Sequence, residues 1–248
     1  MSKLFSFVLA ALALLTQAQA AEVKVAVAAN FSAPMQKLAQ VFERQTGHKA
    51  LLSFGGTGSL HAQIRHGAPF QVLLAADDET PRRLEAEGLG VPGSRFTYAT
   101  GRLVLWSRQP GLVDEQGEVL RSGQLQLLAI ANPKLAPYGA AAIEALTKLG
   151  LLAQWRPRLV QGDSIGQAYQ FVATANAPLG FVALSQVQVD GRIAQGSAWV
   201  VPASLHQPIR QDALLLKAGQ GHPAASALLA FLQGEQARAL IRSFGYEI

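Results

Sequence analysis

Short apolar strand patterns alternate with amphipathic helix patterns along this chain, and that order restricts the fold more than any other feature. Residues 23–27, Val-Lys-Val-Ala-Val, alternate as a strand, and the segment 34–46 places apolar residues at helical spacing. Two further strand patterns follow at 50–54 and 70–76, with a short helix pattern between them. Strands that alternate with helices form a mainly parallel sheet covered by helices, so the sequence predicts an α/β fold.

A second series of strand and helix patterns follows between Leu125 and Pro202. We see no repeat and no low-complexity linker between the two series, and residues 96–106 read as one long extended segment. The sequence therefore predicts two similar lobes joined by extended crossings, with a ligand cleft between them. We expect lobe 1 to comprise 21–101 and 204–248, and lobe 2 to comprise 102–203.

The N-terminus has the pattern of a secretory signal peptide. Lys3 is followed by an apolar run from Leu4 to Leu15 and by the small-x-small site Ala18-Gln19-Ala20, so we expect residues 1–20 to be removed after Ala20. The apolar run is too short to span a membrane. The chain has no cysteine, which excludes disulfides and thiolate metal sites and fits a periplasmic location.

Charge and histidine spacing exclude two further classes of function. The formal charge is +5, but the longest basic run, Arg82-Arg83, stands among glutamates, so nucleic-acid binding is not expected. The five histidines show no metal-ligand spacing, and we expect His61 and His66 at the surface. Asp77-Asp78-Glu79 follows a strand and is interpreted as a helix cap rather than a cation site.

The stretch Ser53-Phe54-Gly55-Gly56-Thr57-Gly58-Ser59-Leu60 lies between a strand and a helix start. Its glycines and hydroxyls offer free N–H groups, side-chain donors and the positive end of a helix dipole, which suit a small anion. It lacks the Gly-Lys-Ser/Thr of a nucleotide-binding P-loop. Taken alone, the stretch is more simply interpreted as an ordinary helix N-cap at Thr57 or Ser59.

Four strand-to-helix turns carry small or polar residues where the helix starts: 30–32, 57–59, 138–139 and 164–166. In open α/β sheets these carboxyl-end turns are where ligands bind. Two such turns in each lobe predict a cleft lined by helix N-termini, which can bind a dianion without lysine or arginine.

Residues 162–166, Gly-Asp-Ser-Ile-Gly, also match the G-x-S-x-G nucleophile elbow of hydrolases. Ser164, Asp190 and either His206 or His222 stand in the chain order of a hydrolase triad. No His-Gly-Gly-Gly oxyanion segment accompanies them. A secreted serine hydrolase using Ser164 is therefore the alternative to an anion-binding protein.

The motifs at these turns resemble those of the periplasmic molybdate-binding proteins of molybdate ABC transporters, over essentially the whole mature chain. The motifs are Val27–Phe31 with Met35-Gln36, Ser53–Leu60, Ala75–Asp77, Asn132-Pro133 with Pro137–Gly139, Ala177–Val182 and Phe244–Tyr246. The resemblance implies a two-lobed protein that closes on molybdate or tungstate by hinge motion and delivers the ion to an inner-membrane ABC permease. It implies neither an enzyme nor a cofactor, and we expect a monomer.

Carried over position by position, the resemblance also names ligand-binding residues. The first-turn donor falls on Asn30, with Ser32 near it, and the second-turn hydroxyl on Thr57; the backbone donors of lobe 2 fall on Tyr138 and Ile165. The molybdenum atom itself would not be bound directly, and only the oxygens of the molybdate ion would contact these residues: Asn30, Thr57, Tyr138 and Ile165. In this reading the Ser164 turn presents the Ile165 N–H and is not catalytic.

Two positions depart from the family pattern. Asn30 replaces a frequent serine, and Ala183 stands where a tyrosine is often found, so we expect the Tyr138 phenol to replace the missing one. A shell of neutral donors favours a fully ionised tetrahedral dianion, and a shell set for a large ion leaves sulfate with stretched hydrogen bonds. We expect molybdate and tungstate to bind well above sulfate; another oxyanion, such as sulfate or thiosulfate, is the nearer alternative.

Overall fold

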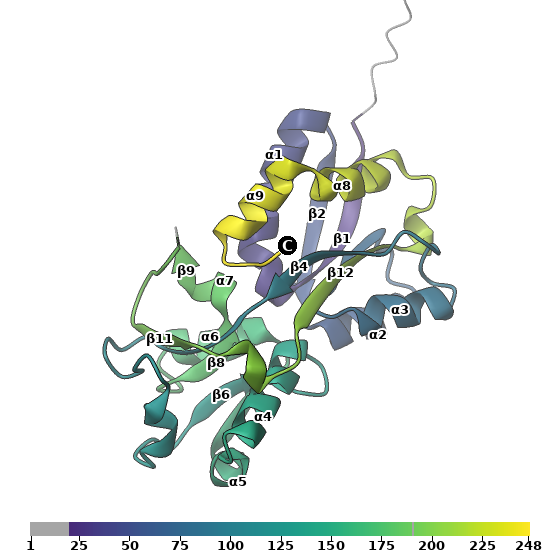
Figure 1. Ribbon diagram of the computed structural model, residues 1–248. Helices are drawn as coiled ribbons and strands as arrows, with labels where there is room; N and C mark the ends of the chain where they lie inside the picture. Colours follow the sequence, from purple (N-terminus) through teal and green to yellow (C-terminus); the bar gives the residue numbers. More distant parts are fainter. Residues whose placement is uncertain (1–19, 190) are drawn as a thin grey trace, which may run out of the picture.

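The computed structural model describes residues 20–189 and 191–248, which form two α/β lobes (Figure 1). Each lobe contains a five-stranded sheet with helices packed against it, and the predicted fold class is confirmed. Apart from Ala20, the predicted signal peptide lies outside the described residues, as does Asp190. No helix among the described residues is long and apolar enough to cross a membrane.

The first sheet has the strand order β2-β1-β3-β12-β4. Its strands are β1 (Glu22–Ala28), β2 (Lys49–Gly55), β3 (Val72–Leu74), β4 (Phe96–Gly101) and β12 (Ile209–Leu215). β1 is parallel to β2 and β3, whereas β12 is antiparallel to β3 and β4. The sheet is thus mixed, because β12 returns from the other lobe in the opposite direction. All five strands fall within 21–101 and 204–248.

Five helices surround this sheet: α1 (Ser32–Thr46), α2 (Thr57–Arg65), α3 (Glu79–Ala86), α8 (Pro223–Gln233) and α9 (Glu235–Ser243). A short 3-10 turn, η1 (Ala29–Phe31), precedes α1, and another, η5 (Lys217–Gly219), follows β12. α1 forms where Met35, Leu38 and Phe42 recur on one face, and all three are fully buried. The helix ends at Gly47, whose φ of +73° suits glycine.

The second sheet has the order β11-β5-β8-β6-β7. Its strands are β5 (Leu103–Ser107), β6 (Leu128–Ala131), β7 (Leu159–Gly162), β8 (Gly180–Ala183) and β11 (Ser197–Val200). β6 is parallel to β7 and β8, and β5 is antiparallel to β8 and β11, so both sheets share one pattern of strand directions. All five strands fall within 102–203.

The helices of the second lobe are α4 (Pro137–Lys148), α5 (Leu152–Trp155), α6 (Ile165–Ala173) and α7 (Leu184–Val187). Three 3-10 turns, η2 (Glu118–Arg121), η3 (Arg156–Arg158) and η4 (Ala203–Leu205), and a small ladder of β9 (Gln188–Val189) with β10 (Arg192–Ile193) complete it. α4 and α6 each follow a parallel strand, so their N-termini lie at the edge of the sheet that faces the first lobe (Figure 1).

The chain crosses between the lobes at Arg102 and again between β11 and β12. The predicted extended segment 96–106 is therefore two strands, one in each sheet. Gly101 lies directly at the first crossing, where a Cβ atom would overlap the Tyr138 hydroxyl oxygen of the second lobe and the Gln211 amide. A glycine at this position lets the two lobes approach.

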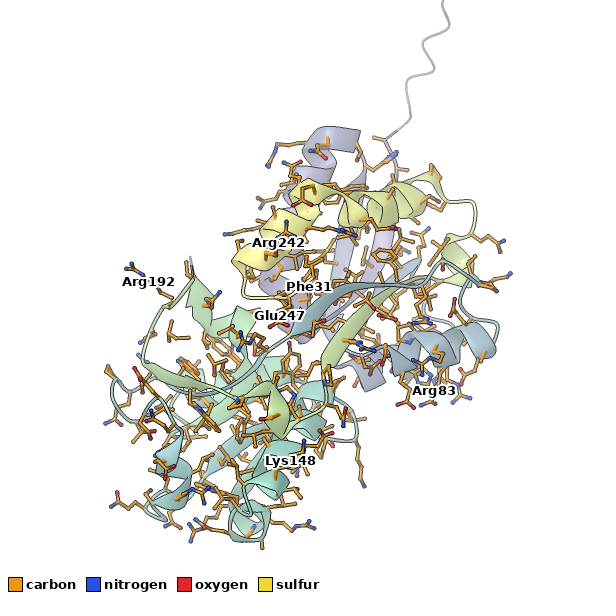
Figure 2. All side chains as sticks on the ribbon, in the orientation of Figure 1. Phe31, Arg83, Lys148, Arg192, Arg242 and Glu247 are labelled. Atoms are coloured by element: carbon orange, nitrogen blue, oxygen red, sulfur yellow. The ribbon has the colours of Figure 1, made fainter. Side chains whose placement is uncertain are left out.

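Each lobe has its own apolar core. Phe31, Met35 and Phe42 lie in the core of the first lobe, and Trp155 and Phe181 in that of the second. In Figure 2, Phe31 lies inside the first lobe, and Arg83 and Arg192 lie at the periphery of the molecule.

One histidine differs from the expectation that it lies at the surface. His61 is 9 % exposed, because α2 packs against α3 and brings Glu87 to 3.7 Å from its Nε2 atom. His66, one turn further along, is exposed as expected.

Candidate functional site

A small cavity lies between the lobes, where the four predicted strand-to-helix turns meet. Its walls come from lobe 1 (Ala28, Ala29, Asn30, Gly55, Gly56, Thr57 and Ala76) and from lobe 2 (Ala136, Pro137, Tyr138 and Ile165). The cavity has a volume of about 10 Å³, roughly the space that one water molecule needs. Peptides and sugars are therefore excluded, and only a very small ligand is compatible with it.

Thr57 brings a hydroxyl group to this cavity from the first residue of α2. It is 2 % exposed, and its Oγ1 accepts a hydrogen bond from the Ala76 N–H at 3.0 Å. Since that oxygen is already an acceptor, the hydroxyl proton is left to donate in another direction. The Thr57 N–H is one of the first-turn N–H groups that no helical carbonyl reaches.

The glycines beside Thr57 allow the second lobe to come close. Gly58 donates its N–H to the carbonyl oxygen of Leu135 in lobe 2 at 2.9 Å. A Cβ atom on Gly56 would stand 2.7 Å from the carbonyl oxygen of Asp163, also in lobe 2. The glycine loop therefore forms a wall of the cavity and a contact surface between the lobes.

Lobe 2 contributes the N-termini of two helices. α4 begins at Pro137, which has no N–H to leave unpaired, and Tyr138 follows it. α6 begins at Ile165 after the N-cap Ser164, whose Oγ accepts the Gln167 N–H at 3.3 Å. The N–H groups of Tyr138 and Ile165 lie in first turns and make no backbone hydrogen bond to other described residues outside the helices.

Ser164 is thus a helix cap in this structure. Among the described residues, no hydrogen bond joins it to His206 or His222, and the ring of His206 contacts the carbonyl oxygen of Gln207. The third residue of the hydrolase alternative, Asp190, lies outside the described residues. The hydrogen bond of Ser164 to the Gln167 N–H gives Ser164 the role of ordering the turn that precedes the Ile165 N–H.

Asn30 lines the cavity from η1 and is 1 % exposed. Its Nδ2 donates to Gln211 Oε1 at 2.8 Å and to the Tyr246 hydroxyl at 2.9 Å. Its Oδ1 is buried and has no hydrogen-bond partner. Its carbonyl oxygen accepts from Ser185 of lobe 2 at 2.8 Å.

Two residues singled out from the sequence lie elsewhere. Ser32 does not line the cavity, because its hydroxyl donates to the Ala29 carbonyl oxygen at 2.8 Å. Ala183 is fully buried at the start of α7, and its N–H donates to Gln186. The Tyr138 hydroxyl accepts from Gln211 Nε2 at 3.0 Å, so part of its hydrogen-bonding capacity faces the protein.

The cavity itself carries no charge. Tyr138 is the only ionisable side chain among its described lining residues, and burial raises its pKa well above the usual value, so it stays neutral. The described residues also contain no cluster of three or more histidine or carboxylate groups that could hold a metal ion. The arrangement therefore provides neutral N–H and O–H donors and the positive ends of helix dipoles, which together bind an anion.

A wider groove of about 470 Å³ continues outward from the cavity and shares Ala76, Ala136 and Pro137 with it. Its rim carries both signs of charge, including Arg83 and Asp77. Asp77 accepts the Thr80 N–H of the first turn of α3 at 2.8 Å, whereas the side chain of the N-cap residue itself, Asp78, makes no capping bond. Burial, the largest cause, raises the pKa of the Asp77 carboxyl to about 6.

Sequence analysis missed Gln211 as a residue of the site. It is fully buried in β12 but stands between Arg210 and Asp212 in the sequence, so no local pattern distinguishes it from its polar neighbours. Tyr246 belongs to the C-terminal motif Phe244–Tyr246 but was not predicted to lie at the site. Ser185 was not predicted to have any role. All three reach Asn30 from distant parts of the sequence, through contacts that periodicity cannot indicate.

Comparisons with known proteins place the chain in one family. The family model described as bacterial extracellular solute-binding protein matches residues 23–247. The chain is 59 % identical to the molybdate-binding protein ModA of Azotobacter vinelandii and 52 % identical to that of Rhodobacter capsulatus. Each match covers 92 % of this chain, with 91 % and 89 % of the two relatives. The solved structure of the Azotobacter vinelandii periplasmic molybdate-binding protein superposes with a TM-score of 0.88 at 43 % identity, covering 91 % of this chain and 99 % of the other.

Proposed function

The chain belongs to the bacterial extracellular solute-binding proteins, and within them to the periplasmic molybdate-binding proteins, and we propose that it binds its anion in the cavity between the lobes. It is the substrate-binding component of a molybdate ABC transporter and not an enzyme. The donors in this proposal come from Asn30, Thr57, Tyr138 and Ile165. Ser32 is left out, because its hydroxyl is bonded within η1. The observation that carries the proposal is the meeting of four helix starts, two from each lobe, around an uncharged cavity.

Neutral donors are sufficient to hold a dianion here. A hydrogen bond to a charged group contributes roughly 1.5–3 kcal/mol. Each helix N-terminus adds about 0.3–1 kcal/mol, and more where it is partly buried. A shell of several donors from both lobes can therefore offset the cost of removing the anion from water without a lysine or arginine.

The same shell accounts for selectivity against anions that carry a proton. Backbone N–H groups can only donate, and the Thr57 hydroxyl, whose oxygen already accepts from Ala76, has its proton free to donate. A ligand that carries its own proton, such as hydrogen phosphate, would place its O–H group next to an N–H or O–H group of the shell, with no acceptor between them. An unpaired buried donor is costly, so the shell favours an anion with no proton.

Selectivity against sulfate depends on size, since sulfate has the same charge and shape as molybdate with shorter bonds. The walls of the cavity are held by packed helices and by the contacts of Gly56 and Gly58 with lobe 2, so the walls resist contraction around a smaller ion. Sulfate would then leave some donors at stretched distances. Tungstate, which matches molybdate in charge and shape, is expected to bind similarly.

Further proposals concern the working environment of the protein. We expect the chain to be cleaved after Ala20, to act in the periplasm as a monomer without a cofactor, and to pass its ligand to an inner-membrane ABC permease. The family and the identity to the two ModA proteins support the periplasmic location and the permease as a partner.

Thermal unfolding with a panel of oxyanions tests the proposed function. A ligand at about a thousand times its Kd adds roughly 4 kcal/mol to the free energy of unfolding, which raises the Tm by several degrees. We expect millimolar molybdate and tungstate to raise the Tm of the mature protein, and sulfate and phosphate to leave it nearly unchanged. Equal shifts with sulfate and molybdate would contradict the size argument, and no shift with any oxyanion would contradict the ligand assignment.

A further inference from the structure

A network of buried polar side chains from both lobes lies against the cavity. Its members are Asn30, Tyr98, Gln211 and Tyr246 of lobe 1 and Tyr138 and Ser185 of lobe 2, and each is at most 5 % exposed. We call this set the interlobe network. Only Asn30 and Tyr138 among its members also line the cavity.

Gln211 is the member that joins these two cavity residues. Its Oε1 accepts from Asn30 Nδ2 at 2.8 Å, and its Nε2 donates to the Tyr138 hydroxyl at 3.0 Å. The pairing register of β12 shifts between Gln211 and Asp212, and both consecutive side chains are fully buried. In this shift Gln211 pairs with Ala99 and Asp212 with Thr97, so Tyr98 of β4 is the extra residue, and its hydroxyl lies 3.1 Å from Gln211 Oε1.

The hydroxyl and amide protons of the network cannot satisfy all the contacts that its oxygen and nitrogen atoms make. The Tyr98 hydroxyl has one proton but lies 3.0 Å from the Ala75 carbonyl oxygen and 3.1 Å from Gln211 Oε1, which are both acceptors. Asn30 Oδ1 has no donor at all. With these amide orientations, one phenol contact lacks a proton and one buried acceptor remains unpaired.

Turning both amide groups by half a turn gives a second arrangement with the same heavy-atom positions. Gln211 Nε2 then donates to Asn30 Oδ1 and to the Tyr98 hydroxyl, Tyr98 donates to the Ala75 carbonyl oxygen, and Tyr138 donates to Gln211 Oε1. One hydrogen bond is lost at the opposite end of the network, around Tyr246 and Ser185. Each of these hydroxyls has a single proton, and the two protons must serve both oxygens of Asn30 and the contact between the hydroxyls themselves. The two arrangements therefore satisfy the same number of contacts.

The two amides must turn together. Reversing Asn30 alone would set its Oδ1 against Gln211 Oε1 at 2.8 Å, with no proton between two acceptors. The orientation of Gln211 thus determines which atom Asn30 leaves unpaired. In the first arrangement that atom is an oxygen, and in the second it is a nitrogen with a free N–H.

We propose that Gln211 is a positioning residue that turns the Asn30 amide so that its N–H faces the bound anion. This inference rests on the proposed function. A dianion stabilises the second arrangement, because it accepts the free Asn30 N–H and would be repelled by Oδ1. The change costs little, since the network satisfies equally many contacts in both arrangements. The same change turns the Tyr138 hydroxyl from an acceptor into a donor toward Gln211, so the amides respond as one unit across the lobes.

Two substitutions of Gln211 test this role through the pH dependence of molybdate affinity. In Gln211→Glu, the carboxylate can only accept, so it holds Asn30 Nδ2 toward itself and leaves Oδ1 toward the anion. We expect at least about a tenfold weaker Kd at about pH 8, the effect of one lost hydrogen bond to a charged group. Affinity should recover toward about pH 5.5, because burial raises the pKa of the new carboxyl and its protonated form can donate to Asn30.

Gln211→Met is the matched control, since it fills similar space and cannot hold Asn30 in either orientation. We expect a smaller loss of affinity, with the pH profile of the wild type. Burial raises the pKa of Tyr98, Tyr138 and Tyr246, so these phenols do not titrate in this range. Asp77, with a pKa of about 6, titrates in all three proteins, and the wild-type profile corrects for it.

Tyr98→Phe keeps the inference testable if the buried carboxyl prevents folding. The phenol does not line the cavity, yet its loss removes two hydrogen bonds from the second arrangement and one from the first. We expect molybdate affinity to fall by about threefold to tenfold, the effect of roughly one net hydrogen bond, in a variant that still unfolds cooperatively. Unchanged affinity in Tyr98→Phe, or equal and pH-independent losses in both Gln211 variants, would overturn the positioning role while leaving the proposed function intact. A wild type that binds no oxyanion would instead refute the proposed function.

Discussion

The hydroxyl oxygen of Thr57 lies 3.0 Å from the backbone nitrogen of Ala76 and accepts its hydrogen bond. This contact directs the remaining hydroxyl proton away from Ala76, because an oxygen that accepts from one side donates on another. A buried threonine at a helix start is thereby turned into an oriented donor. The cavity then needs no charged residue to recognise an anion.

Replacing Thr57 by valine removes this donor while keeping the shape of the side chain. We expect Thr57→Val to weaken molybdate binding roughly ten- to a hundredfold, because a hydrogen bond to a charged group is lost. The Ala76 N–H also loses its acceptor, which should lower the free energy of unfolding by about 1–3 kcal/mol. Isothermal titration calorimetry measures the first effect and thermal unfolding the second. Thr57→Ser is the control and should keep most of the affinity; equal affinity in the valine variant would exclude Thr57 from the shell.

A methyl group on Gly56 should hold the lobes apart. The backbone of Gly56, with a φ of −68° and a ψ of 142°, suits alanine, but the new Cβ atom would lie 2.7 Å from the Asp163 carbonyl oxygen. We expect Gly56→Ala to weaken molybdate binding by at least about tenfold, an effect of roughly 1.4 kcal/mol, with little loss of unliganded stability. Small-angle scattering should show a larger radius of gyration in the presence of molybdate than for the wild type. Gly234→Ala, at a backbone of similar φ within lobe 1, is the control, and matching results for the two variants would argue against lobe contact at Gly56.

The Asp77 carboxyl should make stability and affinity depend on pH. Its pKa in the folded protein is about 6, above the usual value of 3.8, so the folded state binds the proton more tightly than the unfolded state. Stability is therefore highest below about pH 4 with respect to this group, and falls as the pH rises toward 6. The charge that forms lies one residue from the cavity residue Ala76, so it should also weaken binding of a dianion as the pH rises.

Asp77→Asn tests both effects, and the asparagine oxygen can still accept the Thr80 N–H. We expect a higher Tm at pH 7, a flatter dependence of Tm on pH between about 4 and 6, and molybdate affinity increased by about twofold to fivefold at neutral pH. Affinity measured in low and high salt separates the two effects, since salt screens the charge effect. Identical pH profiles for the variant and the wild type would contradict the assigned pKa.

The helix starts could be predicted from the sequence because each has a local signal. Thr57 follows two glycines at the end of a strand, and Ser164 caps the helix that presents Ile165. Local patterns of this kind, taken with strand order, place both residues at the same edge of their sheets. Ser32 shows the limit of the method, because a hydroxyl at a helix start can equally bond to its own turn.

Gln211 and Tyr246 could not be found in this way. Gln211 is one of three consecutive polar residues, 210–212, and the register shift of β12 against β4 that buries both Gln211 and Asp212 is invisible to a period-two pattern. Tyr246 reaches Asn30 only because the C-terminal segment returns to the start of the chain. Such contacts depend on tertiary packing, which the sequence pattern does not specify. The reversal of β12 in a sheet expected to be mainly parallel has the same origin.

Locating molybdenum in a crystal of the mature protein grown with molybdate shows whether the anion binds between the lobes. The anomalous signal of the metal identifies its position without any assumption about the binding residues. We predict a single strong peak between the lobes, with oxygens within hydrogen-bonding distance of the Thr57 hydroxyl and the N–H groups of Tyr138 and Ile165. A peak in the outer groove, or no peak between the lobes in crystals that contain molybdate, would contradict the account.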